Sequence, residues 1–204
     1  MNLSKLSTEV GGGEINRETS SVVSIANSEG ASDTRSSRSV TMKADGSGQK
    51  RLTSVPGYDG GPFFTQDGKK IVWRRFDEKG LIADVWTMNP DGSEQTQITD
   101  FGSMSWAPYM HPSGAYYFFA SNKLGFENFE VFIVDAAGAK EPVRVTYSDG
   151  FDGLPVPSPD GKQLAWTSTR SGGGAGQLFL AQWNHEKALD ALKAAPPKKP
   201  SKRS

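Results

Sequence analysis

Short apolar runs separated by turn residues cover most of this chain. From Ser39 onward, segments rich in Val, Ile, Phe, Tyr and Trp alternate with clusters of Asp, Asn, Gly and Pro. Runs of this kind are typical of β-strands. Some of them, such as residues 116–119 (YYFF), are apolar at every position, which predicts strands that are covered on both faces.

The runs repeat at a fixed interval. Gly68, Gly114 and Gly161 occupy the same place in three similar segments and lie 46 and 47 residues apart. A second series of turn glycines, Gly46, Gly92 and Gly138, is spaced by 46 residues. A repeat of this length indicates stacked supersecondary units, each of which buries its faces against its neighbours.

Each repeat is predicted to contain four short strands. The first complete repeat places them at 61–65, 70–76, 84–88 and 96–99, and the second at 106–110, 115–120, 129–135 and 143–147. A third supplies 154–157, 163–168 and 177–183, and a partial one before the first supplies 39–43 and 50–53. Asp-Gly pairs at 67–68 and 160–161 predict two-residue hairpin turns.

The fold class that follows is all-β. Four-stranded antiparallel sheets repeating every 46 residues or so are the blades of a β-propeller, and this chain holds an incomplete ring of about three to four blades. Pro62, Pro108 and Pro155 stand at strand starts, where a missing amide hydrogen costs least.

Three regions are expected along the chain. Residues 1–38 are Ser-, Gly- and Glu-rich and are either disordered or a degenerate first blade, since residues 21–26 (SVVSIA) are β-prone. Residues 39–184 carry the propeller repeats. Residues 185–204 form a short amphipathic helix and a basic, proline-rich tail.

The composition limits the partners and the kinds of site that can be expected. The 23 basic and 23 acidic residues cancel, so no overall field favours nucleic acid or an anionic membrane. No run reaches the roughly 18 apolar residues of a membrane span, so membrane insertion is not expected. Cysteine is absent, which excludes disulfides, thiolate metal sites and cysteine nucleophiles. No cofactor is expected.

The repeat resembles the WD40-like propeller repeats of the TolB type. The matching segments are 42–53 (MKADGSGQKRLT), 61–73 (GPFFTQDGKKIVW) and 153–166 (GLPVPSPDGKQLAW). The resemblance implies a non-catalytic, six-bladed scaffold of the bacterial periplasm that binds a protein or peptide in Tol-Pal biopolymer transport. Residues 1–14 lack the apolar core of an export signal, and the blades are too few for that ring, which suggests a fragment.

Two other functions stay open at this point. Similar repeats precede or gate peptidase domains, so the chain can be an accessory propeller that guides substrate to a hydrolase domain absent from it. Aromatic residues at a channel mouth can also stack on sugars, which makes a carbohydrate-binding propeller the third interpretation. An incomplete ring leaves apolar blade faces in water, so self-association through them is expected.

The residues expected to bind a partner lie where the first strands begin and in the loops after the second strands. Variable loops on a rigid scaffold are common recognition sites. Asp59 and Asp152 occupy equivalent positions, and either they contact a partner at the channel mouth or they organise an Asx-type turn. The full expected set is Asp59, Arg74, Arg75, Trp106, Asn122, Asp152 and Arg170.

Catalytic and metal-binding residues are not predicted. His111 is interpreted as a surface turn residue and His185 as a neighbour of a helix cap, and neither has a second ligand at zinc-binding spacing. A G-x-S-x-G nucleophile elbow is also absent from the sequence.

Overall fold

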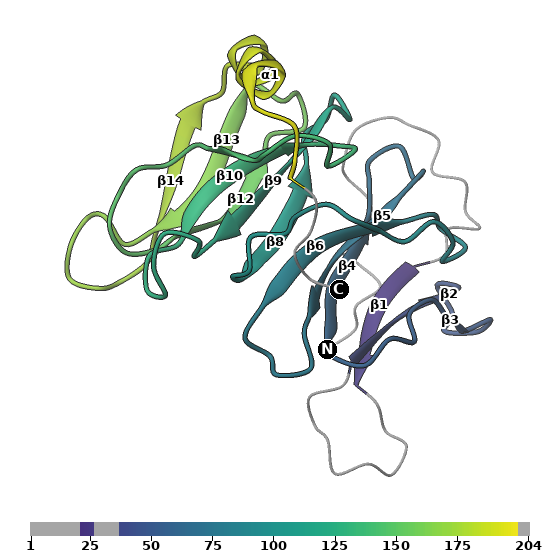
Figure 1. Ribbon diagram of the computed structural model, residues 1–204. Helices are drawn as coiled ribbons and strands as arrows, with labels where there is room; N and C mark the ends of the chain where they lie inside the picture. Colours follow the sequence, from purple (N-terminus) through teal and green to yellow (C-terminus); the bar gives the residue numbers. More distant parts are fainter. Residues whose placement is uncertain (1–20, 27–36, 200–204) are drawn as a thin grey trace.

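The computed structural model describes residues 21–26 and 37–199, with the backbone alone described for 21–26. These residues form four antiparallel sheets and one helix (Figure 1). Blade 1 contains β1 (Ser21–Ala26), β2 (Ser37–Met42) and β3 (Lys50–Arg51). Blade 2 contains β4 (Asp59–Phe64), β5 (Ile71–Phe76), β6 (Ala83–Met88) and β7 (Thr96–Gln97). Blade 3 contains β8 (Ser105–Met110), β9 (Tyr116–Ser121), β10 (Glu130–Asp135) and β11 (Val143–Arg144). Blade 4 contains β12 (Asp152–Pro157), β13 (Gln163–Ser168) and β14 (Gln177–Gln182), and α1 (His185–Ala194) follows it.

Within each blade the strands pair in chain order. Blades 2 and 3 are complete four-stranded sheets, whereas blades 1 and 4 have three described strands each. The β-prone segment Ser21–Ala26 is β1 and pairs with β2 along its whole length. In Figure 1 the blades follow one another from blade 1 at the lower right to blade 4 at the upper left. The predicted fold class, an incomplete β-propeller of three to four blades, is confirmed.

The last strands of blades 1, 2 and 3 are shorter than their apolar patterns predict, because a threonine hydroxyl replaces part of the ladder. Thr99 Oγ1 accepts the backbone N–H of Val85 at 2.9 Å, where a longer β7 would otherwise pair with β6. Thr53 and Thr146 accept the N–H groups of Ser39 and Val131 in the same way. A side chain therefore satisfies a backbone donor that the sheet leaves open.

The turns between first and second strands are longer than the predicted two-residue hairpins. In blade 2, Thr65 N–H donates to the Lys70 carbonyl, and four residues lie between them. Gly68 has a φ of +67°, whereas Asp67 is not in the positive-φ region. The Asp67 carboxylate instead accepts from the Thr65 hydroxyl and the Lys69 N–H, so it braces the loop from inside. The Thr65 hydroxyl holds the pKa of Asp67 below its ordinary value.

Apolar side chains fill the spaces between blades. The interface of blades 2 and 3 buries Val72, Val85, Ile98, Met110, Tyr117, Phe119, Phe132 and Val134. The interface of blades 3 and 4, with α1, buries Tyr116, Phe118, Val131, Ile133, Leu164, Trp166, Ala188 and Leu192. Successive residues of β9 thus face opposite neighbours, which confirms that this strand is covered on both sides. Each such side chain contributes about 1.5–3 kcal/mol when fully buried.

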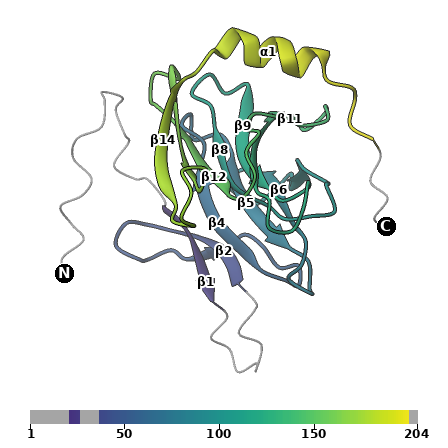
Figure 2. The same ribbon diagram turned by 90° about the vertical axis from the view of Figure 1, so that its left-hand side faces the viewer.

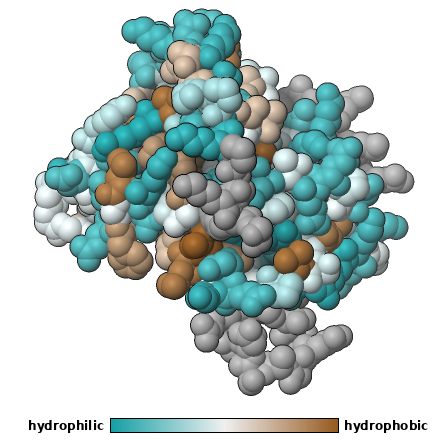
Figure 3. Space-filling view, in the orientation of Figure 1, coloured by the Kyte–Doolittle hydropathy of each residue, from teal (hydrophilic) through white to brown (hydrophobic). Residues whose placement is uncertain are grey.

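The outer face of blade 4 has no neighbouring blade in the described structure. Its apolar side chains are exposed, with Leu178 78% and Leu180 63% accessible. Leu154 and Val156 of β12 are exposed on the same blade. Figure 3 shows hydrophobic atoms at the surface on the side where β14 lies. An apolar sheet face of this kind is unusual on a monomeric surface.

Helix α1 crosses one end of blades 3 and 4 (Figure 2). Asn184 caps it by accepting the N–H of Lys187, and Ala188 and Leu192 are its buried residues. Within residues 21–26 and 37–199 no helix has the length and apolarity that crossing a membrane requires.

Candidate interaction surface

The predicted binding loops lie at one end of the blades, beside the starts of the first strands. The register aligns Asp59 of β4 with Arg75 of β5, and Arg75 with Asp84 of β6, so these strand ends are level. Parallel bridges join Ala83 to Met104 and Phe129 to Phe151, from each third strand to the start of the next blade. The β5–β6, β9–β10 and β13–β14 loops therefore share this end of the molecule.

Arg74 and Trp106, both predicted as binding residues, meet across the boundary of blades 2 and 3. The guanidinium carbon of Arg74 is 5.9 Å from the ring centroid of Trp106 and 5.9 Å from that of Tyr58. Such distances permit cation–π attraction. Arg74 was expected in the loop after the second strand, but it lies in β5, which ends at Phe76 as the predicted strand 70–76 does.

Trp106 continues a row of aromatic rings. It stacks on Phe129 at a centroid distance of 5.1 Å and an interplanar angle of 28°. Phe129 lies 5.6 Å from Phe151, which precedes the first strand of blade 4. Tyr58, Trp106, Phe129 and Phe151 are called the aromatic row below. It crosses blades 2 to 4 at the end where the three loops emerge.

Three polar atoms around this row lack hydrogen-bond partners in the part of the chain that the structure describes. Arg74 Nε, Trp106 Nε1 and Asn128 Oδ1 are buried atoms without a hydrogen-bond partner among the described residues. A buried polar atom left unpaired costs about 1–3 kcal/mol, so such groups are rare in folded proteins. Two donors and one acceptor at the aromatic row are thus buried and unpaired within the described part of the chain.

The first strand of each blade has a bulge beside this surface. Gly61, Ala107 and Leu154 have φ values of +58°, +48° and +55°, and the ladder register shifts at all three. Each precedes a proline, which has no amide hydrogen to give to the ladder. A side chain at Gly61 would lie 3.6 Å from Arg74 Nη1, so the guanidinium rests over this bulge. Positive φ at Ala107 and Leu154 is strained backbone, a feature that gathers at functional sites.

Asp59 and Asp152 lie inside their blades. Each has a relative exposure of 0%. Asp59 accepts from Trp73 Nε1 at 2.9 Å and pairs with Arg75. Asp152 accepts from Trp166 Nε1 at 3.2 Å and pairs with Arg170. Their carboxylates are therefore bound within the protein, and direct contact with a partner stays a prediction.

The arginines of these pairs differ in exposure. The side chain of Arg75 is 11% exposed and lies over Trp73 and Trp86, with its guanidinium carbon 5.3 and 4.7 Å from their centroids. The side chain of Arg170 is 32% exposed and covers Trp166 and Phe179 in blade 4. Arg170 is thus the more accessible of the two.

Asn122 is an internal residue of its loop. Its Oδ1 accepts the N–H of Met104 at 2.8 Å, and its Nδ2 donates to the Phe126 carbonyl. It is buried and shapes the β9–β10 loop, whereas the nearby Phe126 is 75% exposed. Asn122 is therefore placed to position a contact surface, and contact with a partner by its own side chain stays a prediction.

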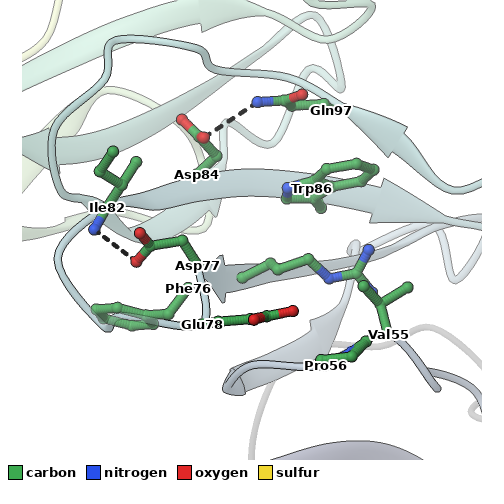
Figure 4. A pocket seen from close by; sticks show the side chains of 10 residues that line it. Val55, Pro56, Phe76, Asp77, Glu78, Ile82, Asp84, Trp86 and Gln97 are labelled. Carbon is green, nitrogen blue, oxygen red and sulfur yellow. Dashed lines mark hydrogen bonds between the residues drawn. The ribbon is translucent and has the colours of Figure 1, made fainter. Parts of the chain in front are cut away.

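A pocket of about 330 Å³ opens beside the Arg75 pair (Figure 4). Figure 4 shows Asp84, Trp86 and Gln97 along one wall, with Phe76, Glu78, Val55 and Pro56 opposite. Asp77 accepts the backbone N–H of Ile82 and closes one end. The remaining lining residue is Arg75. The pocket therefore has an aromatic wall and is lined by both acidic and basic side chains.

The third strands carry buried acids that were not among the predicted site residues. Asp84 accepts from Gln97 and Thr99, and Glu130 accepts from Arg144 and Thr146. Their spacing could have revealed them, because Asp84 and Glu130 lie one 46-residue repeat apart and therefore occupy equivalent positions. These acids tie the third strand to the short fourth strand.

His111 is not the surface turn residue that the sequence predicted. It is 3% exposed, because it is equivalent to Thr65 and Ser158, the positions before the turn, and lies next to α1. The described residues contain no cluster of three or more His, Asp or Glu side chains suited to a metal ion.

Comparison with known proteins places these features in a family. The TolB beta propeller domain matches residues 22–191 of this chain. The comparison with curated proteins gives no match.

Solved structures with a similar fold include two described as TolB. The protein from Acinetobacter baumannii has a TM-score of 0.67 at 23% identity, over 83% of this chain and 40% of that one. The protein from Agrobacterium tumefaciens has a TM-score of 0.64 at 21% identity, over 79% of this chain and 56% of that one. The chain thus spans about half the length of these structures or less.

A peptidase also shares the fold. A puromycin-hydrolysing peptidase from Mycobacterium tuberculosis has a TM-score of 0.50 at 16% identity, over 74% of this chain and 23% of that one. At such identity the likeness concerns the fold alone. The family match covers most of the chain, in agreement with the blade topology and the strand register, and this chain therefore belongs to the TolB beta propeller domain family.

Proposed function

We propose that this chain is a non-catalytic propeller scaffold that binds a protein or peptide at the aromatic row, in the periplasm of a bacterial envelope. The observation that carries the proposal is the Arg74–Trp106 pair. It places a guanidinium and an indole, each with an unpaired buried N–H, beside exposed loops. Aromatic and arginine side chains of this kind are the common anchors of protein interfaces.

The chemistry of the row fits a peptide. Arg74 and Trp106 supply donors for carbonyl or carboxylate oxygens, and Asn128 Oδ1 supplies an acceptor for an N–H. The rings of the row supply flat apolar surface between them. Arg170 and the loop around Phe126 extend the surface on blades 3 and 4. Membership of the TolB family supports the periplasmic location.

A displayed library of random peptides, selected on the purified chain, tests the proposal. Selected peptides should bind Arg74→Ala and Trp106→Ala variants at least about ten-fold more weakly than the native chain. Arg51→Ala is the matched control, because Arg51 is exposed on the short outer strand of blade 1. Failure to select any peptide, or equal losses in the Arg74 and Arg51 variants, would contradict the proposal. A glycan array on the same protein separates peptide binding from sugar binding.

A second function, that of an accessory propeller guiding substrate to a peptidase, has one observation in its favour. The fold is shared with the puromycin-hydrolysing peptidase. Hydrolysis of chromogenic peptides by the product of the complete reading frame would favour this function. Turnover should then fall in the Arg74→Ala variant if the aromatic row guides the substrate.

Self-association is part of the proposal. The outer face of blade 4 exposes Leu178 and Leu180, whereas the equivalent faces of blades 2 and 3 are covered by the next blade. A second copy of the chain would bury this apolar surface.

A further inference from the structure

The chain from Trp183 to Lys199, called the C-terminal strap below, joins three blades. Helix α1 contributes Ala188 and Leu192 to the interface of blades 3 and 4. Beyond the helix, Lys198 N–H donates to the Ala139 carbonyl of blade 3 at 2.8 Å. Its ammonium group donates to the Gln97 and Ile98 carbonyls of blade 2 at 3.2 and 3.1 Å. The strap therefore fastens blades 2, 3 and 4 along one side (Figure 2).

A pair of stacked imidazoles holds the beginning of the strap. The rings of His111 and His185 are 4.6 Å apart and parallel within 3°. The His111 ring also stacks on Tyr116 at 4.6 Å, and Tyr116 lies 5.7 Å from His185, so the three rings form one cluster. Gly161 lies against the edge of the same ring, since a Cβ there would come within 2.7 Å of His111 Nε2. Two residues 74 positions apart in the sequence thus form one contact.

Both ring nitrogens of His111 have hydrogen-bond partners. Nδ1 lies 3.1 Å from the backbone N–H of Ser113, which donates to it, and 2.8 Å from the Ser113 hydroxyl, which can donate to Nδ1 or accept from it. Nε2 lies 3.2 Å from the Gly161 carbonyl, which can only accept, so a proton on Nε2 is bonded there. A second proton on Nδ1 would face the backbone N–H of Ser113 and would need the Ser113 hydroxyl as its acceptor.

His185 joins the same cluster through Nδ1. Trp183 Nε1–H donates to the Tyr116 hydroxyl oxygen at 2.7 Å. The tyrosine proton is then free to point at His185 Nδ1, 3.1 Å away. Burial raises the pKa of Tyr116 to about 12, so the hydroxyl keeps its proton near neutrality. A proton on His185 Nδ1 would reverse the direction of this hydrogen bond.

The charged groups near the pair do not compensate a positive ring. Asp160 and Lys162 flank Gly161, and Glu186 and Lys187 follow His185 on α1. The Asp160 carboxylate is engaged by the Ser158 hydroxyl and the Lys162 N–H in its own turn. Within the described chain no ion pair joins either imidazole to a carboxylate. Burial, and the neighbouring His185, lower the pKa of His111.

We infer that His111 and His185 form a proton-operated latch, which holds the C-terminal strap on the blades at neutral pH and releases it in acid. Protonation of both rings places two like charges face to face at a centroid distance of 4.6 Å. Release would uncover the interface of blades 3 and 4 and free Lys198 from blade 2. Imidazole is the side chain whose charge changes in this pH range.

Hydrogen exchange of the full chain, followed by mass spectrometry at about pH 7.5 and about pH 5, tests the latch. After correction for intrinsic rates, peptides from residues 183–195 should exchange at least about ten-fold faster at the lower pH. Peptides from β5 and β6 should keep their protection. Equal protection of the strap at both pH values would overturn the proposal.

Two variants test whether the two histidines cause the release of the strap. In the double variant His111→Gln and His185→Gln, neither side chain titrates, so exchange of the strap should no longer depend on pH. Acid-induced release that persists in this folded variant would overturn the proposal. Leu192→Asp is the positive control, because a charge at this buried position should release the strap at pH 7.5 as well.

Discussion

The buried Asp59 carboxylate accepts a hydrogen bond from Arg75 Nε at 2.7 Å and another from the indole of Trp73. Blade 4 repeats the arrangement with Asp152, but its arginine, Arg170, comes from two positions further along the chain. Blade 3 has Ser105 in place of the aspartate. The pair is thus maintained in two blades by different backbone positions.

Removing the carboxylate should destabilise the protein. Asp59→Ala leaves Arg75 without its buried partner, and a loss of about 3–5 kcal/mol in the free energy of unfolding is expected. Urea denaturation measures it. Ser105→Ala, at the equivalent position of blade 3, should cost about 1 kcal/mol or less. A small effect of Asp59→Ala, similar to that of Ser105→Ala, would show that the pair is not structural.

Removing Thr99, the threonine that shortens β7, should also destabilise the protein. Thr99→Val removes the acceptor for the buried Val85 N–H and is expected to cost about 1–3 kcal/mol. Thermal unfolding checks this against Thr96→Val, where the side chain is exposed and the cost should be within about 0.5 kcal/mol. Equal melting temperatures for the two variants would contradict the role assigned to Thr99.

The bulge in β12 leads to a conformational prediction. Leu154 is exposed and has a φ of +55°. Asparagine adopts this conformation more easily than leucine, whereas valine is β-branched and resists it. Leu154→Asn should therefore be at least as stable as the native chain, and Leu154→Val less stable by about 1 kcal/mol or more. Calorimetry of the three proteins would refute the prediction if their order were reversed.

The apolar face of blade 4 should control association. Sedimentation is expected to show assemblies larger than a monomer, and Leu178→Lys with Leu180→Lys should shift them toward monomer by placing charges on the exposed face. Leu81→Lys is the control, since Leu81 is an exposed leucine in the β5–β6 loop of blade 2. A native chain that sediments as a monomer across a wide dilution series would exclude this interface.

Acid should lower the global stability through His111. Its pKa is lowered in the folded chain, so on acidification the unfolded state takes up the proton first. Stability is therefore complete above the ordinary imidazole pKa of about 6.5 and falls as the pH drops toward the folded value, by at most about 1.4 kcal/mol per pH unit. Urea unfolding at about pH 7.5 and about pH 5.5 measures the slope. His111→Gln should flatten it, and an unchanged slope in that variant would assign the effect to other groups.

The features that could be predicted correctly are those encoded by residues close together in the chain. The glycines at 46-residue spacing predicted the blades, and the apolar run in β9 predicted a strand buried on both faces. It also singled out Arg74 and Trp106, which the fold brings together. The charged ends of β4 and β12 were harder to interpret, because a carboxylate before a strand has the same pattern whether it faces solvent or pairs inside the sheet.

The repeat, the strands and the all-β class could be predicted from the amino-acid sequence, because turn propensity and apolar periodicity are properties of neighbouring residues. The burial of Asp59 and Asp152, the contact of Arg74 with Trp106 and the stacking of His111 on His185 became visible only in three dimensions. Each of those facts depends on packing within and between blades. A contact across a blade boundary joins residues far apart in the chain, and nothing in the local pattern specifies which positions will face each other.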